Sequence, residues 1–255
     1  MKEFPILFSD ALVPPILTDR KTQTRRLLSP SRCLVDGVRW APKRFTWLRF
    51  NSAVRDSGPS PVGNPGPYLH CPMDGSDTVH RVYPIWQPGD RLWVKHTWYL
   101  HSAGIDSWDE FTGICRNTEG DSMDWRGVLT PQTAAQNLWT KKHPWFMPRW
   151  ASSITLEVVK VRIQRLHEID EADARAEGAE PNWVDDLKGF DPDVHGFLIP
   201  CPVHGRDGCE CSNGVTAREW IEWKWDRIHG KTTPWASNPW VIATTFRRII
   251  EQVTE

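Results

Sequence analysis

One run of strand-forming residues organises the rest of the chain, Ser153-Ile154-Thr155-Leu156-Glu157-Val158-Val159-Lys160-Val161-Arg162-Ile163-Gln164-Arg165. Its apolar residues fall first on one parity and then on the other: Ile154, Leu156 and Val158, followed by Val159, Val161 and Ile163. Because alternate residues of a strand face opposite sides of a sheet, the slip at Val158-Val159 predicts a bulge. A bulged strand of this length can bend from one side of a barrel to another.

Other strands are expected on either side of this run. Apolar residues alternate from Phe4 to Phe8, and Pro5 predicts that this strand is short or lies at a sheet edge. Arg91–Trp98 follows a turn signal and alternates in the same way, with His96 on the apolar parity, which favours a core histidine. Trp240–Ile250 is mostly apolar and predicts a closing strand.

Three short helices are expected. Pro14-Pro15 predicts the start of one that runs to Asp19. In Asp170–Gly178, Asp170 is the expected amino-terminal cap and Gly178 the stop, which leaves Glu177 as an unfavourable carboxylate at the carboxyl end. Thr216–Glu219 is a capping box, and the helix that it opens carries an apolar stripe, which includes Ile228, and ends before Gly230.

The remaining segments, 29–88, 101–146 and 179–215, are rich in Pro, Gly, Ser and Asp. We interpret them as irregular insertions in one domain that covers residues 1–255, because long loops inside a compact domain usually serve a function. Short strands, small helices and one long bulged strand together predict an α+β fold, a small mixed barrel with large loops.

Composition narrows the function. The chain has 255 residues and a formal net charge of −1, which disfavours a long polyanion and suits a small ligand better. No apolar run is long enough to span a membrane, and the amino end lacks the pattern of a secretory signal, so we expect a cytosolic protein. Sixteen tryptophans predict a core built on indoles, a few of which could stack on a nucleobase.

The segment Asp19-Arg20-Lys21-Thr22-Gln23-Thr24-Arg25-Arg26 has hardly an apolar atom to bury. Lys21 and Thr24, three residues apart, would face one another if the backbone were helical or tightly turned. A lysine beside a hydroxyl is one way to activate a nucleophile. A solvated basic loop is the competing interpretation.

Four soft ligands gather late in the chain, at Cys201, His204, Cys209 and Cys211. A structural zinc site needs four such groups in a tetrahedral arrangement. The single residue between Cys209 and Cys211 is a short spacing for two ligands of one tetrahedral site. Free thiols on a loop are the alternative, and we expect no cofactor in catalysis in either case.

Taken together, four blocks resemble the ASCH domains of the PUA-like superfamily, above all the long ASCH proteins of phages and prophages. The blocks are Arg20–Arg26, Gly89–Val94, Met147–Ser152 and Asp170–Gly178, and they cover less than a third of the chain. The resemblance implies a PUA-like β-barrel and a ligand drawn from RNA or its modified bases.

One small bacterial branch of that family consists of amidohydrolases that remove the acyl group from N4-acetylcytidine and related N4-acylated cytosines. Carried over by motif, their catalytic lysine, threonine and glutamate fall on Lys21, Thr24 and Glu177. The glutamate match rests on a divergent stretch, and Glu168, Glu171 or Asp173 could serve instead. This chain is more than twice as long as those enzymes. The residues expected to bind substrate are Arg20, Arg25, Arg26 and Trp93.

Two functions follow as expectations. In the first, Thr24 attacks the acyl carbonyl, and either a neutral Lys21 or Glu177 takes the proton; a neutral lysine at pH 7 requires its pKa to fall by about 3 units. In the second, the chain is a non-catalytic reader in which Lys21, Arg25 and Arg26 grip phosphate while a tryptophan stacks on a base. The sequence leaves the oligomeric state open.

Overall fold

The computed structural model describes residues 1–29, 32–39, 53–56, 68–72, 79–119, 121–124, 130–136, 138–179 and 216–250. They form a mixed α+β fold of several sheets and short helices, as the sequence predicts. The chain divides into two compact units, each assembled from separate stretches. Unit 1 comprises Met1–Thr22, Ile85–Val161 and Thr244–Glu255, and unit 2 comprises Gln23–Pro84 and Arg162–Ala243.

The first sheet has the strand order β1-β8-β14-β15-β2. Its strands are β1 (Glu3–Leu7), β8 (Arg91–Lys95), β14 (Thr155–Arg165), β15 (Trp240–Ile249) and β2 (Gln23–Leu27). The long strands β14 and β15 each begin in one unit and end in the other. Strand β1 lies at the edge, parallel to β8, where the missing N–H of Pro5 costs no ladder hydrogen bond, so the predicted edge position is confirmed.

Strand β14 changes its buried parity where the sequence predicts it. Leu156 and Val158 are buried in its first half, and Val161 and Ile163 in its second half. Between them lie two consecutive exposed residues, Val159 and Lys160. The predicted slip is confirmed, but Val159 is 49% exposed instead of belonging to the second buried set. Because side chains alternate between the two faces of a strand, two consecutive exposed residues shift the buried set from one face to the other.

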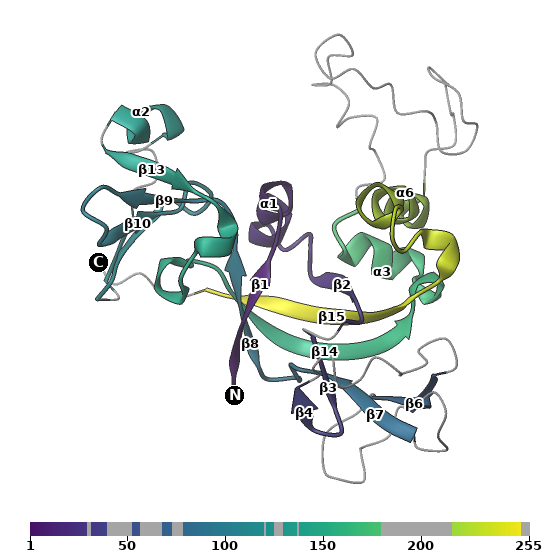
Figure 1. The fold of residues 1–255 in the computed structure, drawn as a ribbon. Coiled ribbons are helices and arrows are strands. Elements are labelled where there is room, and N and C mark those ends of the chain that lie inside the picture. Colours follow the sequence, from purple (N-terminus) through teal and green to yellow (C-terminus); the bar gives the residue numbers. More distant parts are fainter. Residues whose placement is uncertain are drawn as a thin grey trace, which may run out of the picture. The chain divides into compact units, whose positions relative to one another are not determined.

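Unit 1 contains a second sheet of order β12-β11-β10-β9-β13 (Figure 1). Its strands are β9 (Trp98–His101), β10 (Asp106–Trp108), β11 (Ile114–Asn117), β12 (Ser122–Asp124) and β13 (Trp139–Lys142), and helix α2 (Pro131–Gln136) lies against β13. Tyr99, Trp108 and Trp139 form the centre of its core, which confirms that indoles fill part of the interior. Helix α1 (Val13–Leu17) of the same unit begins beside Pro14-Pro15 as predicted.

Unit 2 contains a third sheet of order β4-β3-β7-β6-β5. Its strands are β3 (Cys33–Val35), β4 (Val38–Arg39), β5 (Val54–Asp56), β6 (Tyr68–Pro72) and β7 (Val79–Pro84). Segments 29–88 and 101–146, expected to be irregular, therefore contain most of two sheets. Their strands are only two to six residues long, too short for a period-two pattern to stand out among turn residues.

Helices α3 (Glu171–Ala176) and α6 (Ala217–His229) of unit 2 lie side by side (Figure 1). Both predicted caps are present: Asp170 Oδ1 accepts from Asp173 N at 2.7 Å, and Thr216 with Glu219 forms the capping box. The two helices bury a core that includes Trp225 and Trp235. Ile228 was expected on the buried stripe and is 65% exposed, because it belongs to the last turn of α6, beyond this core.

Short 3-10 helices complete the described structure, at Asp10–Leu12, Pro144–Phe146, Arg149–Ala151, Leu166–Glu168 and Trp235–Ser237. Each sheet order is open, with different strands at its two ends, so no closed barrel is found among the described residues. None of the helices in this part of the chain combines the length and the apolar character that crossing a bilayer requires.

Candidate active site

Lys21 is almost fully buried in unit 1, with 3% of the residue exposed. A left-handed residue, Asp19 with φ 56°, ends the turn after α1, and the Lys21 amide then donates to Pro15 O at 2.9 Å. The Lys21 ammonium lies 5.8 Å from the centroid of the Phe8 ring. Burying a lysine is costly unless a partner or a task offsets the cost, so a solvated basic loop is the wrong interpretation for this residue.

Thr24 and Arg25 lie in strand β2 of unit 2, and both are buried, at 4% and 8% exposure. Residues 23–27 are extended, so Thr24 does not have the helical spacing from Lys21 that would make the two side chains neighbours. The structure thus assigns Lys21 to one unit and Thr24 to the other. Their convergence remains part of the proposal below.

Glu177 caps the carboxyl end of α3, and it is buried with 8% exposure. Its Oε1 accepts from Arg25 Nη1 at 3.1 Å. The ion pair gives a physical reason for a carboxylate at a helix end that disfavours it, since the guanidinium supplies the opposite charge. Of the predicted site residues, Arg25 and Glu177 are the pair that the structure brings into contact.

Two of the alternative carboxylates have structural tasks. Glu168 is exposed and forms an ion pair with Arg55 at 2.5 Å. Glu171 accepts from the backbone N–H groups of Ala217 and Arg218, at 3.0 and 3.2 Å, and so satisfies the first turn of α6. Neither arrangement points to catalysis, and both favour Glu177 over these two residues.

Asp173 is the centre of a polar network beside Glu177. Arg25 Nη2 donates to Asp173 Oδ2 at 2.5 Å, and Arg162 Nη2 donates to Oδ1 at 2.8 Å. Gln23 Nε2 also donates to Oδ1, at 2.9 Å, and its own Oε1 accepts from Arg162. Burial alone would raise the pKa of Asp173, but the hydrogen bond from Arg162 and the charges of Arg25 and Arg162 lower it.

Gln23 and Arg162 also belong to this network, and neither is predicted as a site residue from the sequence. Gln23 stands inside the basic segment and Arg162 on the second half of the long strand. In the sequence, these two residues are recognisable only as polar positions in strands whose other residues are largely buried. This pattern does not identify the carboxylate with which they pair.

The other residues expected to bind substrate are divided between the units. Arg26 of unit 2 is buried around its guanidinium, which lowers its pKa to about 10; the charge of Arg32 acts in the same direction and that of Glu177 opposes it. Arg20 of unit 1 is exposed, and its Nε donates to Thr18 Oγ1 at 3.1 Å. Trp93 of unit 1 is half-buried in β8, with Lys95 Nζ 5.5 Å from its ring centroid.

The predicted zinc ligands, Cys201, His204, Cys209 and Cys211, lie outside the described residues. Within the described part of the chain, Cys33, Cys71 and Cys115 are buried free thiols. Burial raises the pKa of Cys33 and of Cys71 to about 12 and that of Cys115 to about 11. A thiol reacts as its thiolate, so these three are suited to packing and not to nucleophilic chemistry.

Comparison of the chain with protein-family models, with curated proteins and with solved structures finds no significant match. The assignment of a function therefore depends on the geometry described above and on the motif resemblance.

Proposed function

We propose that this protein is an amidohydrolase that removes the acyl group from N4-acylated cytosine nucleosides such as N4-acetylcytidine. Lys21, Thr24 and Glu177 are the proposed catalytic residues, and a PUA-like architecture is part of the same proposal. The observation that carries it is the burial of all three residues, each at 8% exposure or less, although each is polar or ionisable. Ionisable side chains are rarely buried without a partner or a function.

In the proposed reaction, the Thr24 hydroxyl oxygen attacks the acyl carbonyl carbon, and its proton passes to a neutral Lys21. The tetrahedral intermediate then breaks its C–N bond, and the cytosine amine leaves with the proton that Lys21 returns. Water attacks the acyl-threonine ester, which releases the carboxylic acid and restores the hydroxyl. If Lys21 is instead charged, it holds the oxyanion while Glu177 takes the proton from Thr24 or from water.

The contacts of Glu177 support its place in this scheme. The ion pair with Arg25 fixes one carboxylate oxygen, and Arg25 is itself held by Asp173, which Arg162 and Gln23 hold in turn. A catalytic carboxylate needs such a fixed orientation, because proton transfer works only over hydrogen-bond distances. We therefore assign Arg25, Asp173 and Arg162 as positioning residues.

The alternative is a non-catalytic reader of RNA or of a modified base. Burial of Lys21 and Arg25 weighs against it, because residues that grip a phosphate backbone must reach the surface of the protein. Arg20, in contrast, is exposed. A small nucleoside agrees better than a long strand with the burial and with the net charge of −1.

The decisive experiment incubates the protein with N4-acetylcytidine and quantifies cytidine by liquid chromatography. We expect release of cytidine, and a loss of kcat by about 10²-fold or more in Lys21→Ala, Thr24→Ala and Glu177→Gln. The matched control is Glu168→Gln, which alters an exposed carboxylate paired with Arg55 and should turn over normally. Circular dichroism spectra verify that each variant is folded.

Two results would change the assignment. Wild-type turnover in Thr24→Ala would remove Thr24 as the nucleophile and leave water in that place. No release of cytidine, together with binding of RNA oligonucleotides that weakens steeply with added salt, would establish the reader instead.

A further inference from the structure

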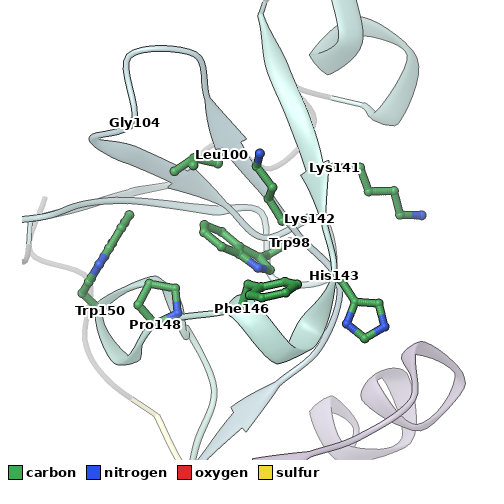
Figure 2. Close-up of a pocket in the computed structure, with 9 residues that line it drawn as sticks. All are labelled: Trp98, Leu100, Gly104, Lys141, Lys142, His143, Phe146, Pro148 and Trp150. Carbon is green, nitrogen blue, oxygen red and sulfur yellow. The ribbon is translucent and has the colours of Figure 1, made fainter.

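A hollow of ≈ 550 Å³ lies on the β9–β13 side of the second sheet, within unit 1 (Figure 2). Its volume is in the range of pockets that hold small molecules. The residues that matter for its chemistry come from β9, from the end of β13 and from the 3-10 helices that follow. They are Trp98, Leu100, Lys142, Phe146, Pro148 and Trp150.

Lys141 and Lys142 both line the hollow, and strand register places their side chains on opposite faces of the sheet. Lys142 pairs with Trp98 across the β9–β13 ladder, so the two side chains lie on the same face of the sheet. Lys141 pairs with Tyr99, whose ring belongs to the core on the opposite face. Figure 2 shows the Lys141 side chain on the opposite side of β13 from Lys142, which extends beside Leu100 and Trp98.

The walls of the hollow are aromatic. Trp98 and Trp150 meet edge to face, with ring centroids 6.3 Å apart and an interplanar angle of 87°. Phe146 is 78% exposed, and its neighbour Trp145 is 70% exposed. Two large rings that stay in water beside a hollow form an apolar patch of the kind that marks binding sites.

Trp98, which lines the hollow, carries a buried hydrogen-bond donor without a partner in the described part of the chain. Trp98 is 4% exposed, and its indole Nε1 has no hydrogen-bond partner among the described residues. A buried N–H without a partner costs free energy.

We propose that the hollow binds a nucleotide, with the base stacked on the exposed Phe146 ring and a phosphate paired with the Lys142 ammonium. Stacking on an aromatic side chain beside a cation is how proteins hold single bases and their backbone. The ligand chemistry is shared by a free mononucleotide and by one unit of a single strand. This site is separate from the residues of the proposed amidohydrolase and does not rest on that function.

Charge decides between a nucleotide and a proline-rich peptide, which also docks on exposed aromatic rings. Lys141, Lys142 and His143 follow one another at the end of β13, and Lys95 Nζ donates to Trp145 O at 2.5 Å nearby. A basic rim beside rings favours an anionic ligand, because a proline-rich segment brings no charge of its own.

The test is isothermal titration calorimetry with uridine monophosphate and with a single-stranded oligouridylate, at low salt. Phe146→Ala and Lys142→Gln should each weaken binding about tenfold, the size expected for the loss of one stacking or phosphate contact. Lys160→Gln is the matched control and should change the affinity less than about twofold, since this exposed lysine of unit 1 does not line the hollow. Phe146 is exposed, so its truncation leaves the core intact.

The same titrations distinguish the two sources of the ligand. Equal affinity for the mononucleotide and for the oligonucleotide means that the site takes free nucleotides, whereas binding of the oligonucleotide alone, with a steep salt dependence, means a single strand. No heat with either ligand up to about 5 mM, a range that would detect ordinary weak sites, overturns the proposal. Binding that is undiminished in both Phe146→Ala and Lys142→Gln also overturns it.

Failure of this proposal and failure of the amidohydrolase proposal are distinguishable. Phe146→Ala and Lys142→Gln should release cytidine as the wild type does, because neither residue belongs to the proposed catalytic set, whatever their effect on nucleotide binding. Tight binding of a proline-rich peptide, with no response to either nucleotide, would assign the hollow to a protein partner instead.

Discussion

Arg25 donates from Nη1 to Glu177 Oε1 at 3.1 Å, across 152 residues of sequence. Its Nη2 donates to Asp173 Oδ2 at the same time, so one buried guanidinium serves two carboxylates of helix α3 and its cap. Strand β2 and helix α3 are thereby joined by charge as well as by packing. The arrangement makes specific predictions about stability that do not depend on the proposed reaction.

Replacement of Arg25 by Leu should strongly destabilise the protein. The change leaves Glu177 without this partner and Asp173 with fewer donors, and breaking a buried ion pair typically costs about 3–5 kcal/mol. Urea denaturation of the wild type and of Arg25→Leu measures the difference in the free energy of unfolding. Arg247→Leu is the matched control, because that arginine side chain is 70% exposed in its pair with Glu157 and should cost less than about 1 kcal/mol. Equal losses in the two variants would contradict this prediction.

Stability should depend on pH through His96 and Asp109 of unit 1. The two side chains are buried, with His96 Nε2 3.2 Å from Asp109 Oδ2. Burial alone would lower the pKa of His96, but the charge of Asp109 and its hydrogen bond, the hydrogen bond to Thr97 O and the charge of Asp10 together outweigh it and raise the pKa above the ordinary 6.5. The protonated form is thus favoured by folding. Its contribution is complete below pH 6.5 and is lost as the pH rises through the raised pKa.

Asp109→Asn tests that sign. Without the carboxylate, burial dominates and should lower the pKa of His96, so the variant should gain stability relative to the wild type between about pH 6 and about pH 9. Thermal unfolding midpoints of both proteins are measured across this range. The contributions of the other histidines are the same in both proteins and cancel in the difference between the midpoints. A gap between the two midpoints that stays constant with pH would remove His96 as the titrating group.

The amino-terminal cap of α3 should contribute measurably to stability. Asp170 Oδ1 accepts from Asp173 N at 2.7 Å, and loss of such a cap costs about 1 kcal/mol. We expect this loss in Asp170→Ala and little loss in Asp170→Asn, because the asparagine oxygen can accept the same hydrogen bond. Chemical denaturation compares the three proteins; a similar loss in both variants would mean that the charge, not the hydrogen bond, matters.

A buried hydrogen bond between two side chains of unit 1 offers a near-isosteric test. Trp86 Nε1 donates to Thr244 Oγ1 at 2.9 Å, and both residues are buried. Thr244→Val keeps the shape but leaves the indole N–H without its acceptor, which should cost about 1–3 kcal/mol. Thr244→Ser retains the hydroxyl and should keep the hydrogen bond. If the valine variant is as stable as the serine variant, the hydrogen bond contributes nothing.

The features that the sequence predicts correctly are local. The cap at Asp170, the stop at Gly178 and the capping box at Thr216 each involve residues three to five positions apart, and their hydrogen bonds follow from residue type and spacing. The parity change of β14 is visible for the same reason. The period of side chains along a strand is fixed by the backbone.

The features that the sequence does not predict are distant or short. Gln23 and Asp173 are 150 residues apart, and the residues around each of them give no indication that the two form a hydrogen bond. The strands of the second and third sheets are short and separated by turns, so their pairing depends on partners elsewhere in the chain. The buried state of Lys21 is hidden too, because its sequence neighbours are the charged residues typical of a surface.

Neither compact unit is a contiguous stretch of chain, and β15 supplies residues to both. During synthesis, the hydrogen-bond ladders of the first sheet cannot be completed until residues 240–249 have left the ribosome, because β15 lies between β14 and β2. Ribosome-bound intermediates that lack β15 should therefore expose two unpaired edges, on β14 and on β2, and depend on chaperones until it is translated.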